Sequence, residues 1–258
     1  MKAPMGFVGG LGAAAWLAGQ VTAQSGVSDA KSFGWRQCNE DVLSLNLDPA
    51  PLQQFVGSEF SVRVVEGKAP VLIVVQDCPA NWFDGNEIGP THEVHQWVAI
   101  EGPRDIRPVP GAERTLPTLT WFALFTGSSN AHNRKFWISS GTDSVPIENV
   151  SLDPPGLNWG GRFSVSSDLS YSWQARSAAP SARLMAVNHD VYARDSAGKI
   201  VLNRIQALLN VLAWDSPGTL KVVGTNPNKL ISSGTYAITV HAFRPLWAQA
   251  SLGETPRK

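Results

Sequence analysis

The feature that most constrains the fold is a long series of short, strand-like runs separated by turns rich in glycine and proline. Residues 60–65 and 163–173 alternate apolar and polar side chains at period two, which is typical of a half-buried strand. Residues 70–75 form a continuous apolar run of the kind found in strands buried on both faces. We therefore expect a mainly β fold: a single antiparallel β-barrel or β-cone-like domain with a central apolar cavity and few short helices.

Some segments allow a more detailed prediction. Residues 119–126 are apolar and aromatic and predict a strand, and a polar loop over residues 127–133 leads into another expected strand at 134–138. Residues 102–117 are rich in proline and charge and indicate a loop. Residues 200–214 fit both a strand and a helix face, so the sequence leaves that element open.

The first 23 residues have the composition of a secretory signal peptide. Lys2 supplies the positive start, an apolar or small stretch follows, and residues 21–23 (Val-Thr-Ala) fit the small-x-small cleavage rule. At about a dozen residues, the apolar stretch is too short to span a membrane, which takes roughly 20. We expect cleavage near Gln24, a mature domain over residues 24–258, a secreted or periplasmic location, and no membrane span after cleavage.

Charge excludes one class of partner. The chain has 21 basic and 21 acidic residues, and its formal net charge is zero. Without a basic run to neutralise a phosphate backbone, nucleic-acid binding is not expected. The sequence leaves the oligomeric state open.

The chain has two cysteines, Cys38 and Cys78, and both belong to the expected mature part. An even number of cysteines in an exported protein favours a disulfide over a reactive thiol or a pair of metal ligands. Such a bridge would close a loop of about 40 residues and contribute roughly 3–4 kcal/mol.

Residues 89–98 contain the densest group of polar side chains suited to chemistry. On a strand, Glu93, His95 and Trp97 share one face and His92 shares the other. An acid, a base and an indole would then lie side by side, which suits proton transfer or ligand binding. Hydrogen-bonded structural roles are the alternative for each histidine. No zinc spacing motif or phosphate-binding glycine fingerprint occurs, so we expect no metal and no cofactor.

Tryptophan and a pair of cations supply the other candidates. Trp97, Trp121 and Trp137 are candidate ligand-binding residues, although packing in a β core is the default role of a tryptophan. Arg134 and Lys135 are adjacent, and a solvated surface pair is again the default. Were Lys135 buried, its neighbouring cation would lower the pKa of its amine and make it nucleophilic toward a carbonyl.

The order of these features resembles the acetoacetate decarboxylase-like superfamily, mainly over residues 52–140. The similarity lies in the apolar strand, the Gly-Pro-Thr-His-Glu segment that begins at Gly89, and the basic pair after an aromatic strand. The resemblance implies a β-cone with an apolar cavity, and it places Lys135 as Schiff-base lysine, Arg134 as the neighbour that lowers its pKa, and Glu93 as the cavity glutamate.

These observations give three hypotheses of function. The first is an exported lyase-like enzyme that acts on a small carbonyl-containing or apolar compound, with Lys135, Arg134, Glu93 and His95 as catalytic residues. The second is a non-catalytic, lipocalin-like protein that binds an apolar small molecule. The third is a structural or interaction module of the cell envelope, which predicts no sizeable cavity. The first requires Lys135 to face Glu93 inside the cavity, whereas the second leaves Lys135 on the surface.

Overall fold

The computed structural model describes residues 31–101, 118–176, 179–224 and 228–254. The predicted signal peptide and the loop over residues 102–117 lie outside these ranges. The described elements, in chain order, are β1 (Lys31–Leu47), α1 (Pro49–Val56), β2 (Ser61–Val62), β3 (Ala69–Cys78), β4 (Ala80–Phe83), β5 (Asn86–Glu87), β6 (Thr91–Glu101), β7 (Thr118–Ser128), α2 (Ala131–Ser139), β8 (Val145–Pro146), β9 (Glu148–Leu152), β10 (Asn158–Ser166), β11 (Leu169–Arg176), β12 (Ser181–Arg194), β13 (Ile200–Val223) and β14 (Gly234–Glu254).

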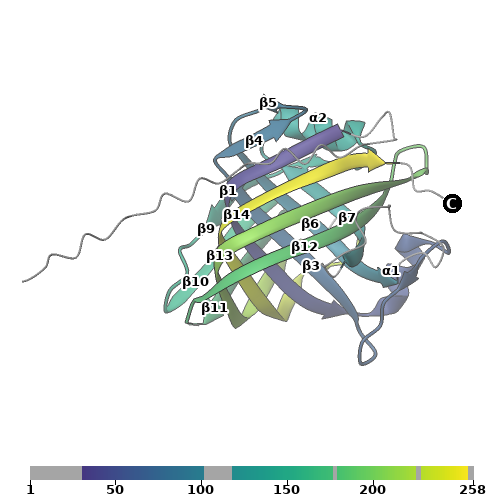
Figure 1. Cartoon of the computed structure of the whole chain (residues 1–258). Helices are drawn as coiled ribbons and strands as arrows, with labels where there is room; N and C mark the ends of the chain where they lie inside the picture. The colour runs from purple at the N-terminus through teal and green to yellow at the C-terminus, as the bar shows by residue number, and fades with distance from the viewer. Residues whose placement is uncertain (1–30, 102–117, 177–178, 225–227, 255–258) are drawn as a thin grey trace, which may run out of the picture.

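The fold is mainly β, as the sequence predicts. The sheet has fourteen strands. Eleven of them follow one path, in the order β5-β4-β1-β3-β6-β7-β12-β13-β11-β10-β9, and β2, β8 and β14 pair with strands of this path. Strand β14 pairs with β1 on one side and with β13 on the other, and Figure 1 shows these long, curved strands side by side. Most pairings are antiparallel, but β7 pairs in parallel with both β12 and β8.

Two local features of the fold follow from a tight turn and from strand pairing. Asp84 and Gly85 form a turn with positive φ values of 44° and 80°. The ambiguous residues 200–214 belong to strand β13, which forms a hairpin with β12 around the turn at Asp195. β-sheet pairing on both sides decides this element, because β13 contacts β12 and β14 along most of its length.

Two predictions of local structure need correction. Residues 134–138 are not a strand, because they lie in helix α2. The run from residue 60 to 65 contributes only the two-residue strand β2. Helix α1 was not predicted either, although Asp48 caps its start and Pro49 occupies its first turn, where proline is tolerated. None of the helices that the structure describes is long and apolar enough to span a membrane.

The sheet buries side chains on both faces of β6. Val94, Val98 and Ile100 belong to the larger hydrophobic cluster, whereas Trp97 and Ala99 belong to a second cluster that includes Trp35, Trp121 and Trp137. The predicted alternation along β6 is therefore correct, and it places Glu93 and His95 on the face of the second, tryptophan-rich cluster. Glu93 is fully buried there, and His95 is 2% exposed.

Candidate functional site

A fully buried carboxylate is the centre of the candidate site. Glu93 Oε1 accepts hydrogen bonds from Trp35 Nε1 at 3.0 Å, Asn133 Nδ2 at 2.7 Å and Thr91 Oγ1 at 3.2 Å, and Oε2 accepts from Trp137 Nε1 at 3.1 Å. A buried carboxylate is costly unless donors of this kind surround it. This cage fixes the position of Glu93 from strands β1 and β6 and from helix α2.

His95 lies directly beside this carboxylate. Its Nε2 is 3.3 Å from Glu93 Oε2, and its Nδ1 is 3.5 Å from Thr126 Oγ1. Two indoles enclose the imidazole, with ring centroids 5.0 Å away for Trp137 and 5.6 Å for Trp97. A carboxylate that holds one nitrogen of an imidazole determines which nitrogen carries a proton, and so prepares the other for proton transfer.

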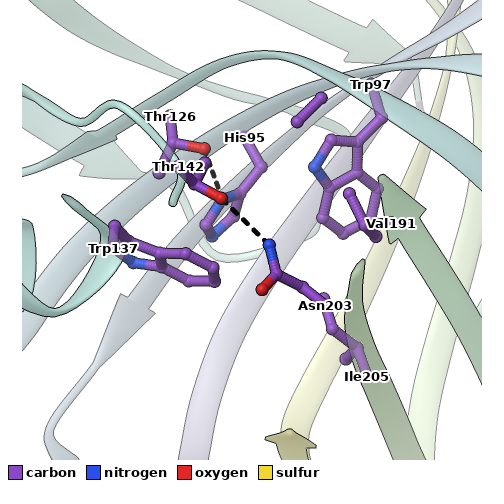
Figure 2. A pocket seen from close by; sticks show the side chains of 9 residues that line it. His95, Trp97, Thr126, Trp137, Thr142, Val191, Asn203 and Ile205 are labelled. Atoms are coloured by element: carbon purple, nitrogen blue, oxygen red, sulfur yellow. Dashed lines mark hydrogen bonds between the residues drawn. The ribbon is translucent and has the colours of Figure 1, made fainter. Parts of the chain in front are cut away.

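The imidazole borders a small enclosed pocket. Figure 2 shows His95 between Trp137 and Trp97, with Asn203 below it in the view, and Asn203 Nδ2 donates to Thr142 Oγ1 at 2.9 Å. The free volume is about 10 Å³, which is at the limit of what one water molecule needs. A pocket is thus present beside His95, but it is far smaller than the central apolar cavity that the sequence predicts. The complete lining consists of His95, Trp97, Ala123, Thr126, Trp137, Thr142, Val191, Asn203 and Ile205.

Helix α2 brings two of the site residues to the carboxylate. It begins after Asn130, whose Oδ1 accepts from His132 N at 2.8 Å and from Asn133 N at 3.3 Å. The two buried side chains of α2 are Asn133 and Trp137, four residues apart and therefore on one helix face. Both donate to Glu93, so this face of the helix completes the cage.

The structure separates Lys135 from the site. Lys135 is exposed, because it follows Asn133 by two residues and a helix turns by about 200° over that distance. The α2 side chain that meets Glu93 is the amide of Asn133, so the expectation of a buried amine facing Glu93 is not met. Arg134 is half-buried and donates from Nη1 to the backbone carbonyl of Ser128 at 2.8 Å, away from Glu93.

The candidate tryptophans also divide into residues that line the pocket and a residue that does not. Trp97 and Trp137 line the pocket, whereas Trp121 is absent from the lining and donates from Nε1 to His189 Nδ1 at 2.9 Å. Burial lowers the pKa of His189 to about 4. The part of the chain that the structure describes holds no group of three or more His, Cys, Asp and Glu side chains that could bind a metal ion.

Sequence reasoning missed several residues of the site. Asn133 was assigned to a polar loop, and Trp35, Thr142 and Asn203 were not singled out. The cap signal at Asn130 could have revealed the helix, and with it the shared face of Asn133 and Trp137. No local signal marks Asn203, since β13 brings it to the pocket from 70 residues further along the chain than Asn133.

The predicted disulfide is present in the structure. Cys38 of β1 and Cys78 of β3 are bonded. Cys78 is also the register partner of Thr91, which donates to Glu93. The bridge thus ties together the strands next to the site.

Comparison with known proteins identifies the fold. No protein-family model and no curated protein sequence matches the chain. Among solved structures, the enduracididine biosynthesis enzyme MppR with bound HEPES gives a TM-score of 0.56 at 10% identity, with 87% of this chain and 86% of that one covered.

Two acetoacetate decarboxylase-type structures match as well. An acetoacetate decarboxylase-like enzyme from Sphingomonas wittichii RW1 gives a TM-score of 0.54 at 12% identity, with 90% and 94% of the two chains covered. Acetoacetate decarboxylase from Legionella pneumophila gives a TM-score of 0.50 at 14% identity, with 87% of this chain and 86% of that one covered. The chain therefore has the fold of the acetoacetate decarboxylase-like enzymes, in agreement with the resemblance of its sequence.

Proposed function

We propose that this protein is an exported enzyme that transfers a proton on a small carbonyl-containing compound, with His95 as the general base and Glu93 as the group that orients it. The observation that supports the proposal is the buried Glu93–His95 pair, 3.3 Å apart, whose imidazole lines a pocket. The shared fold supports the chemical class, because the solved structures of MppR include complexes with pyruvate and with a condensation product of pyruvate.

The proposed chemistry is removal of a proton next to a carbonyl. When His95 Nε2–H donates to Glu93, the lone pair of Nδ1 is the basic site. The hydroxyl of Thr142 lies on the same pocket and can donate to the carbonyl oxygen as it gains charge, whereas the hydroxyl of Thr126 faces Nδ1 at 3.5 Å. Glu93 stabilises the imidazolium that forms, so each group has one role and no covalent step is needed.

This proposal differs from the amine route that the sequence resemblance implies. A Schiff base needs an amine that reaches the bound carbonyl, and Lys135 lies on the exposed side of α2. Borohydride reduction in the presence of small aldehydes and ketones should therefore label Lys135 no faster than other surface lysines, as read by peptide mapping. Selective labelling of Lys135 would restore the amine mechanism.

The test of the proposed reaction is hydrogen–deuterium exchange at the carbon next to the carbonyl, followed by NMR. Acetone, acetaldehyde, pyruvate and acetoacetate form a first panel. His95→Asn should lower the exchange rate by about 10²- to 10⁴-fold, because a general base typically accelerates a reaction by that factor. His189→Asn is the matched control, because His189 is a half-buried histidine outside the pocket lining, and it should keep the rate.

A second candidate function is non-catalytic binding of a small molecule. It is favoured by the narrow pocket and by a carboxylate whose oxygens already accept four hydrogen bonds. The lipocalin-like fold that accompanied this idea has no support. Quenching of tryptophan fluorescence by a panel compound, without exchange in the wild-type protein, would favour binding over catalysis.

Export is part of the proposal and has its own test. The Cys38–Cys78 bond supports an oxidising compartment, where such bonds persist. Expression of the full chain in a secreting host, with amino-terminal sequencing of the product, should give a mature protein that starts near Gln24. Recovery of the intact chain from the cytosol alone would contradict export.

A further inference from the structure

We infer that the pocket beside His95 takes an uncharged carbonyl compound and discriminates against compounds that carry a carboxylate. This inference rests on the proposed function, because it names the substrate class of the same site. It follows from the charges around the pocket, whose free volume of about 10 Å³ must widen before any such compound can enter.

The pocket offers polar groups but no fixed positive charge. Its polar lining is an imidazole, two hydroxyls and an amide, from His95, Thr126, Thr142 and Asn203. The other five lining residues are apolar or aromatic, and neither lysine nor arginine is among the nine. A carboxylate leaving water for such a site would lose its hydration and gain no cation to replace it.

The charged side chains next to the lining residues on β12 and β13 add no positive charge to the pocket. Asp190 and Arg204 adjoin Val191 and Asn203 in sequence, but alternation along β12 and β13 directs them to the opposite face. There Arg204 Nε lies 3.6 Å from Asp190 Oδ1, and the two side chains form an ion pair. His189 shares the face of Val191 and is uncharged at neutral pH, since burial lowers its pKa to about 4.

Glu93 makes the pocket less suited to an anion. A Glu93 carboxylate beside a neutral His95 imidazole carries a net charge of minus one, and the pair is neutral when it holds one further proton. The pair is buried, so water does not screen it well. An incoming carboxylate therefore meets either a neutral pair or a like charge next to His95.

The polar groups that remain fit a carbonyl oxygen. Thr142 Oγ1 accepts from Asn203 Nδ2, so its own hydrogen can point into the pocket (Figure 2). Thr126 Oγ1 lies 3.5 Å from His95 Nδ1 and is the hydroxyl that faces the base. Neutral donors of this kind hydrogen-bond an uncharged oxygen without requiring a counter-ion.

The test compares compounds that match in shape and differ in charge. Pyruvamide and pyruvate form one pair, and acetoacetamide and acetoacetate form another. Dissociation constants come from quenching of tryptophan fluorescence at neutral pH, since Trp97 and Trp137 line the pocket. Each amide should bind the wild-type protein at least about tenfold more tightly than its acid, and the acids should show little exchange at the carbon next to the carbonyl.

A variant tests the cause of this preference. Asn203→Lys places a cation in the pocket and should shift the ratio of the two constants toward the acids by at least about tenfold. Ser172→Lys is the matched control, because Ser172 is exposed on β11 and is absent from this pocket, and it should leave the ratio unchanged.

The outcomes separate the inference from the proposed function. Binding of pyruvate or acetoacetate as tightly as the amide by the wild-type protein would overturn the inference and leave proton transfer at His95 standing. The wild-type comparison suffices for this even if Asn203→Lys does not fold. If no neutral or acidic compound binds, and none exchanges, the proposed function and the inference are both overturned.

Discussion

Glu40 shows how a single residue near the site can set the response of the whole fold to pH. It pairs in register with Gln76, and Gln76 with Glu93, so the three side chains share one face of the sheet. Burial raises the pKa of Glu40 to about 7, although a hydrogen bond from Gln76 and the charge of Arg244 act in the opposite direction. The folded state therefore holds the Glu40 proton more tightly than the unfolded chain.

The sign of this effect gives a prediction. A raised carboxyl pKa adds stability that is fully present below about pH 4.5 and is lost as pH rises to about 7. Across this window, wild type should lose up to about 3 kcal/mol of unfolding free energy relative to Glu40→Gln, at about 1.4 kcal/mol per pKa unit. Urea unfolding at several pH values measures the difference, and a constant difference would contradict the assignment.

His189 contributes in the opposite direction over an overlapping range. Its pKa falls from 6.5 to about 4, so its contribution is present above about pH 6.5 and is lost as pH falls toward 4. The total stability curve therefore mixes two opposed terms, which is why the Glu40→Gln difference is the informative quantity.

Asn133 and Lys135 allow a second test at the scale of residues. Asn133→Leu removes a donor to Glu93 and should cost about 1–3 kcal/mol of unfolding free energy, since it leaves a buried carboxylate with one bond fewer. Lys135→Ala, two positions along the same helix, should change stability by less than about 0.5 kcal/mol and leave exchange activity intact. Equal losses in the two variants would contradict the placement of α2.

At the scale of elements, helix α2 determines whether the site is complete, and its cap is the critical contact. Asn130→Ala removes the acceptor for two backbone amides and should cost about 1 kcal/mol. It should also lower exchange activity, because Asn133 and Trp137 would no longer be held on Glu93. Asp48→Ala at the start of α1 is the matched control, since Asp48 also caps a helix but no α1 residue lines the pocket. Asp48→Ala should lower stability by less, because Asp48 accepts from one backbone amide, and it should leave exchange activity intact.

The comparison of elements shows what the sequence could and could not predict. The strands β3, β6 and β7 were predictable because their apolar patterns are long and unambiguous, and the shared face of Glu93, His95 and Trp97 followed from the alternation of β6. Helix α2 was mistaken for a strand because Phe136, Trp137 and Ile138 form a short aromatic and apolar run that favours either structure. The contacts of Trp35 and Asn203 depend on strand order, which a local pattern does not contain.

At the scale of the whole molecule, the Cys38–Cys78 bond links β1 to β3 across 40 residues of chain. By restricting the unfolded chain, a bridge of this length should contribute roughly 3–4 kcal/mol. The double variant Cys38→Ser with Cys78→Ser should therefore unfold at a lower urea concentration, and a reducing agent should lower the midpoint of wild type but leave that of the variant unchanged. Equal midpoints for wild type and variant under oxidising conditions would contradict the expected contribution.

The pairing of the first described strand with the last has a consequence for biosynthesis. Lys31 of β1 is the register partner of Leu252 of β14, so one edge of β1 has no partner until β14 has been made. A nascent chain that has emerged only as far as β12 exposes that edge, together with the apolar side chains that β13 and β14 later cover. Folding of this sheet must therefore wait until β14 has been synthesised, and the chain that still lacks β14 is the form to which a holdase chaperone would bind.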